Sequence, residues 1–191
     1  REHLAPLDAD IDNLHAALDW AIAQADAERA LAMAAALTGY WEMRSLSADA
    51  VDVVERALSL PAADAHPTLR VRALRAKANG LWQMGRIAEA SGVLAEAETA
   101  ARELDDPAIL TQALRMRVAA EINAERLEVA EAVADEALRW ARATGEDWEI
   151  AQASRGKAIA ASNIADLRER VDKAASLLTG VGATLRLAYL L

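Results

Sequence analysis

Arginine recurs in this chain at a fixed interval of 40 residues, at Arg75, Arg115 and Arg155. A guanidinium group stays charged in proteins, and its planar fork of donors matches carboxylate and phosphate oxygens. One helical turn earlier, the equivalent positions carry three polar side chains: Arg72, Gln112 and Gln152. If each set lies on one face of a helix array, the six side chains form a candidate site for an anionic ligand. The alternative is that the arginines pair with the many Asp and Glu residues nearby.

A second set of basic residues competes for the same role: Lys77, Arg117 and Lys157. Residues two apart on a helix point about 200° apart, since each residue turns the helix by about 100°. The two sets therefore cannot both line one groove, and the sequence leaves open which of them does.

Two tryptophans, Trp41 and Trp82, are nearly one interval apart and could form an aromatic binding platform. Core packing is the commoner role of such residues, so both interpretations stay open.

Catalytic and cofactor chemistry find no support in the residues. The three histidines are scattered along the sequence, cysteine is absent, and no His, Asp and Glu cluster has metal-ligand spacing. The pair Asp105 and Asp106 precedes Pro107, which suits the start of a helix better than acid–base chemistry. No phosphate-binding loop of the Gly-x-x-x-x-Gly-Lys-Ser/Thr type occurs. We therefore expect a protein that is not an enzyme and needs no metal or cofactor.

The composition predicts that helices position these residues. The chain of 191 residues is 54% hydrophobic but only 4% aromatic, and it has four Pro and eight Gly. Its apolar content is largely Ala and Leu, which favour helices. The stretch from Gly85 to Pro107 returns 40 residues later, and such a period is typical of a repeat array.

We expect a single all-α domain over residues 1–191, built as a right-handed solenoid of stacked antiparallel helix pairs. No pair could bury its apolar face alone, so neighbouring pairs would share one core. In that array Ala90, Ala97, Ala130 and Ala137 should be buried where the two helices of a unit meet, and Ser47 should cap a helix. The expected helices cover about residues 8–24, 26–44, 47–60, 68–84, 86–104, 107–123, 125–143, 146–163, 164–178 and 183 onward.

The charge and the two ends of the sequence indicate what kind of protein this is. The net charge is −9, which argues against direct contact with nucleic acid, because that contact needs clustered positive charge. No long uncharged apolar stretch predicts a membrane span, and the first residues lack a signal-peptide pattern. The sequence also begins without Met and ends in apolar residues, so we expect a piece of a longer cytoplasmic, multidomain protein.

The helix pair around Gly85 resembles the tetratricopeptide repeat. The resemblance lies in Gly85, Ile87, Ala90 and Ala97, with Ala78 as the small residue of the preceding helix. The units are longer than the usual repeat of about 34 residues. The resemblance implies that Arg75 and its equivalents face the concave groove.

The longer units resemble the helical region of large bacterial regulators, including LuxR-type ATP-binding regulators and actinobacterial antibiotic regulatory proteins. Two stretches, at residues 12–21 and 167–182, point to the actinobacterial group. The resemblance implies a sensor or scaffold region of a transcriptional regulator in signal transduction, which binds a protein partner or an inducer through its concave face. The alternative is a structural spacer or oligomerisation module between flanking domains.

Overall fold

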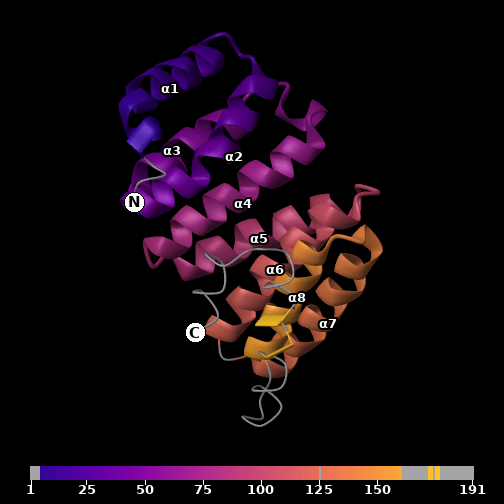
Figure 1. The fold of residues 1–191 in the computed structure, drawn as a ribbon. Coiled ribbons are helices and arrows are strands. Elements are labelled where there is room, and N and C mark those ends of the chain that lie inside the picture. Colours follow the sequence, from indigo (N-terminus) through magenta and orange to yellow (C-terminus); the bar gives the residue numbers. More distant parts are fainter. Residues whose placement is uncertain (1–4, 125, 161–171, 174, 177–191) are drawn as a thin grey trace. The chain divides into compact units, whose positions relative to one another are not determined.

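A computed structural model describes residues 5–124, 126–160, 172–173 and 175–176 (Figure 1). Throughout these residues the regular structure is helical, which confirms the all-α class. The elements are α1 (Ala5–Ala23), α2 (Ala27–Arg44), α3 (Ser47–Leu58), a short 3-10 turn η2 (Ala63–Ala65), α4 (Pro67–Gln83), α5 (Ile87–Arg102), α6 (Pro107–Asn123), α7 (Leu127–Thr144) and α8 (Asp147–Ala160).

The 40-residue period of the sequence is also the period of the helices. The helices α2, α4, α6 and α8 begin at residues 27, 67, 107 and 147, and we call them the A helices. The helices α3, α5 and α7 begin at residues 47, 87 and 127, and we call them the B helices. The helices α2 to α7 therefore form three repeats, each of one A helix followed by one B helix, and α8 is the A helix that follows them.

Local capping chemistry fixes several of these boundaries. Asp26 accepts a hydrogen bond from the amide of Arg29 at the start of α2, at 3.2 Å. Asp106 accepts from the amide of Ala108 at 2.9 Å at the start of α6. At the ends of helices, Gly85 and Gly145 have φ angles of +74° and +69°, which glycine adopts without strain. These four residues lie at the boundaries of helices expected from the sequence.

The predicted cap at Ser47 is wrong. Leu46 precedes α3 and makes no capping hydrogen bond through its side group, and Ser47 is the first helical residue. The Ser47 hydroxyl is instead 2.7 Å from the Gln83 amide oxygen, at the end of α4. The Ser47 hydroxyl therefore contacts another helix and does not cap its own helix. The helices expected at 164–178 and from 183 lie outside the described residues, apart from two short helical pieces at 172–173 and 175–176.

The helices group into two compact units, residues 1–100 and 101–191, and α5 crosses the boundary. In the first unit α1 packs on α2, α2 packs on α3 and α4, and α3 packs on α4. Its core includes Leu31, Trp41 and Val54, each at most 2% exposed. The first turns of α5 also belong to the first unit, where Ala90 packs with Val51 and Leu81.

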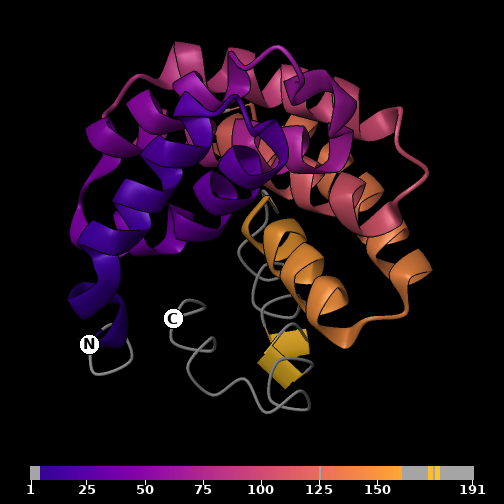
Figure 2. The ribbon, with the colours of Figure 1, turned by 90° about the horizontal axis from the view of Figure 1, so that it is seen from above.

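In the second unit α6, α7 and α8 all contact one another, and the backbone reverses direction between α7 and α8 (Figure 2). Consecutive A helices are therefore neighbours in each unit, as α2 and α4 are in the first. The expectation that Ala90, Ala97, Ala130 and Ala137 are buried is confirmed, since none is more than 2% exposed. The buried positions recur with the period in these sets: Ala50, Ala90 and Ala130; Val54, Leu94 and Ala134; Ala57, Ala97 and Ala137; Leu31, Val71, Thr111 and Ala151.

Candidate functional site

The lysines of the second basic set are held by carboxylates of the B helices. Lys77 on α4 pairs with Glu55 on α3, with 2.9 Å between the ammonium nitrogen and the carboxylate oxygen. Lys157 on α8 pairs with Asp135 on α7. The two pairs are equivalent across two periods of the sequence. Both lysines therefore serve as contacts between an A helix and the B helix before it.

Arg117 departs from this arrangement. The position equivalent to Glu55 and Asp135 is Ala95, which offers no carboxylate. Arg117 lies instead 3.5 Å from Glu121 in its own helix. Glu121 is only 8% exposed and also accepts a hydrogen bond from Arg126, at 2.6 Å. The hydrogen bond from Arg126 is the main reason why the pKa of Glu121 lies below its usual range, and Arg117 adds to the shift.

In the first unit, the basic residues singled out from the sequence lie on α4. This helix carries Arg70, Arg72, Arg75 and Lys77 and no acidic residue. Arg70 pairs with Asp64 at 2.9 Å. Arg75 is half-buried, and Arg72 is exposed. Among the described residues no carboxylate forms an ion pair with Arg72. That guanidinium group is therefore available to a ligand.

In the second unit, Glu149 at the start of α8 bonds two of the predicted site residues, and a third joins them through Arg115. Glu149 is 5% exposed. One of its carboxylate oxygens accepts from Arg115 at 3.2 Å, and the other accepts from Gln112 at 3.3 Å. Arg115 also donates to the amide oxygen of the Gln152 side group, at 3.2 Å. The network ties α6 to α8 and neutralises Arg115.

Arg155 lies beside this network but is not neutralised by it. Its Nε atom is buried and has no hydrogen-bond partner, and no described carboxylate pairs with it. Its positive charge is felt by Arg115. Burial is the main cause that lowers the pKa of Arg115, the Glu149 carboxylate opposes the shift, and the charge of Arg155 adds to it. The structure thus joins Gln112, Arg115 and Gln152 through hydrogen bonds around Glu149, and it places Arg155 close enough for its charge to act on Arg115.

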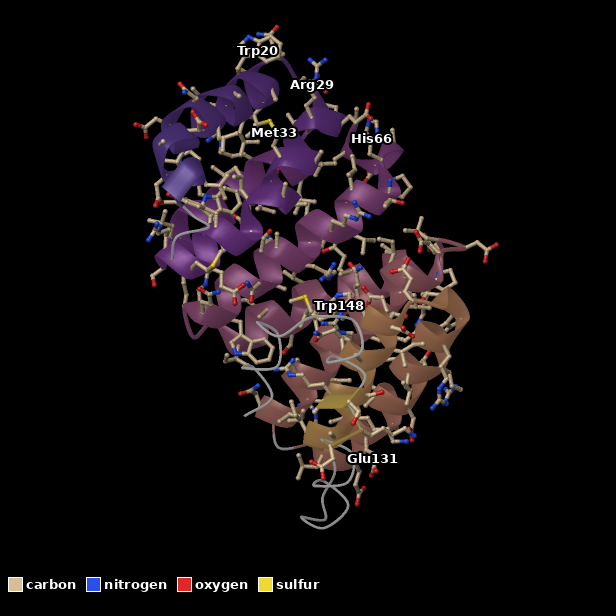
Figure 3. The ribbon with its side chains drawn as sticks, viewed as in Figure 1. Trp20, Arg29, Met33, His66, Glu131 and Trp148 are labelled. Carbon is tan, nitrogen blue, oxygen red and sulfur yellow. The ribbon has the colours of Figure 1, made fainter. Side chains whose placement is uncertain are left out.

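The tryptophans have different surroundings. Trp41 is 2% exposed, and its indole nitrogen donates to the Nε2 atom of His15 at 3.2 Å. It is a core residue, which was one of the two roles the sequence left open. Trp82 is half-buried and packs against the cluster around Leu81. The most exposed indole is Trp20 at the end of α1, where it projects outward (Figure 3).

Charge is distributed unevenly between the two kinds of helix. Each B helix has two more acidic than basic residues. For example, α7 contains four acidic residues and two arginines. Among the A helices, α4 and α6 have six basic residues and one acidic residue, while α2 and α8 are balanced. Among the described helices, an excess of positive charge is therefore found on the A helices α4 and α6.

Glu149 was not singled out from the sequence, although a signal was present. It stands one helical turn before Gln152 and lies in the first turn of α8, where the helix dipole favours a carboxylate. Its proximity to Arg115 follows from the period, because equivalent positions of neighbouring A helices lie side by side. Across the described part of the protein, no group of His, Cys, Asp and Glu could hold a metal ion.

Comparisons with known proteins do not identify a family. No family model matches this sequence, and no curated protein is significantly similar to it. None of the described helices is both long enough and apolar enough to span a membrane.

Proposed function

We propose that this protein is a non-catalytic sensor or scaffold region of a transcriptional regulator, and that it binds an anionic partner on its A helices. The partner is an acidic protein segment or an anionic inducer. In this proposal the helix pairs continue as a right-handed solenoid of the tetratricopeptide type, with the A helices on the concave face. The recurring helix starts and the neighbouring A helices of each unit support that arrangement.

The observation that carries the proposal is the pairing of the basic residues. Lys77 and Lys157 are neutralised by carboxylates of B helices. Arg72 and Arg155 have no such partner among the described residues. A cation kept near other cations gains most from an anionic partner, since local potential follows the charge distribution as well as the net charge.

One observation favours the alternative of a structural spacer. Arg115, the central residue of the predicted column, already has a carboxylate partner in Glu149. If every arginine of the A helices had an internal partner, the column would serve only to join neighbouring helices. Arg72 and Arg155 are therefore the residues that separate the two functions.

Fluorescence anisotropy tests the proposal with a labelled peptide of alternating Glu and Gly, and with its Gln and Gly counterpart. We expect the acidic peptide alone to bind, and more weakly as salt rises. Arg72→Ala and Arg155→Ala should each weaken binding. For Arg72, which is exposed, the loss should be about fivefold, because an exposed charge pair contributes up to about 1 kcal/mol.

Arg142→Ala is the matched control. Arg142 is an exposed arginine near the end of α7, a B helix, and its loss removes the same charge from the other kind of helix. Equal effects of all three substitutions would show that net charge alone attracts the peptide. No binding of the acidic peptide at low salt would favour the spacer.

A further inference from the structure

The cluster on α6 and α8 has one more positive than negative charge. Its charged members are Arg115, Glu149 and Arg155, and its polar members are Gln112 and Gln152. Glu149 is almost completely buried and bonded to Arg115. Because a buried charge is costly unless it is paired, the excess positive charge lies at Arg155.

The unpartnered Nε atom of Arg155 is a donor that a bound acceptor would satisfy. The buried Nε atom lacks an acceptor, and a buried donor without a partner costs free energy. Nε and the adjacent terminal nitrogen form one edge of the guanidinium fork. Two oxygens of one carboxylate can accept from that edge together.

We propose that Glu149 acts as a charge filter, which neutralises Arg115 so that the site at Arg155 accepts one singly charged carboxylate group. The ligand group is the carboxylate of an Asp or Glu residue, of a peptide terminus, or of an inducer. A doubly charged group would leave excess negative charge beside the buried Glu149 carboxylate. The proposal rests on the proposed function for the location of the ligand surface, and it adds the charge that this surface selects.

The charge count predicts opposite effects for two single substitutions. Glu149→Gln keeps the size of the side group and an oxygen that accepts from Arg115, but it leaves two uncompensated cations. Arg115→Met keeps much of the apolar stem and leaves Glu149 to neutralise Arg155. The double variant carries the same excess of one positive charge as the native cluster.

The experiment follows the Nε–H resonance of Arg155 by NMR in the full 191-residue protein, with acetate as the monoanion and sulfate as the dianion at constant ionic strength. Arg155→Ala assigns the resonance, and Arg142 on α7 serves as the exposed control. In the native protein we expect acetate to shift Arg155 and to bind more tightly than sulfate. Glu149→Gln should improve sulfate relative to acetate on the order of tenfold, because a neighbouring negative charge is removed.

Arg115→Met should abolish the response of Arg155 to acetate, and the double variant should restore both the response and the preference for acetate. The site is refuted if acetate shifts Arg155 no more than Arg142. The filter is refuted if acetate binds but Glu149→Gln leaves the preference unchanged. The peptide assay separates the two proposals. Binding of the acidic peptide with no acetate response at Arg155 would refute this inference and leave the proposed function standing. An acetate response at Arg155 with no binding of the acidic peptide would refute the proposed function and leave this inference standing.

Discussion

Ala97→Leu tests whether the helices meet along a seam of small residues. Ala97 lies in α5 and is 0% exposed, like its equivalents Ala57 and Ala137. Leucine adds three carbon atoms where no exposed surface is left, so neighbouring side chains must leave their preferred rotamers. Overpacking of this kind costs about 1–3 kcal/mol of the free energy of unfolding.

Urea denaturation measures this cost. With a slope of about 2 kcal/mol per molar urea, the midpoint should fall by about 0.5–1.5 M. Ala95→Leu is the control, because Ala95 lies on the same helix but is exposed, and its substitution should change stability by no more than about 0.5 kcal/mol. An Ala97→Leu protein with the midpoint of the native protein, or equal losses in both variants, would refute the seam.

The further predictions concern three single residues. Gly39→Ala should stabilise the protein by about 0.5–1 kcal/mol through helix propensity, because a Cβ atom there meets nothing. Gly80→Ala should lower the urea midpoint despite the same gain, because its Cβ would lie 2.7 Å from a methyl carbon of Val51; equal effects at both glycines would contradict this packing. The lowered pKa of Glu121 stabilises the fold above the usual carboxyl range, and this stabilisation is lost as pH falls through the folded-state pKa. Glu121→Gln should therefore reduce stability near neutral pH and flatten its fall between about pH 5 and pH 3, and an unchanged pH profile of urea midpoints would count against the ion pairs with Arg126.

The sequence predicted features that depend on local chemistry or on the period. Asp26, Asp106 and Gly85 mark their helix ends because each acts on backbone within a few residues. The burial of Ala97 and its equivalents followed from their recurrence, since a period that recurs in sequence places equivalent side chains in equivalent surroundings.

Contacts between helices were not predictable in the same way. Ser47 has the chemistry of a cap, but its hydroxyl contacts Gln83 on another helix. Arg115 has many carboxylates within reach along the sequence, and only the packing of α8 on α6 selects Glu149, 34 residues away. Periodicity predicted the positions that face one another, whereas the choice of partner depends on the geometry of the individual side chains.

Mapping of backbone amide shifts on titration with the acidic peptide tests most directly whether the A helices form the binding surface. We predict that the shifted amides cluster on α4, α6 and α8, around Arg72 in the first unit and Arg155 in the second, and that high salt reverses them. Shifts confined to the B helices α3 and α7, or no shifts at a peptide concentration that saturates the anisotropy signal, would contradict the proposed function.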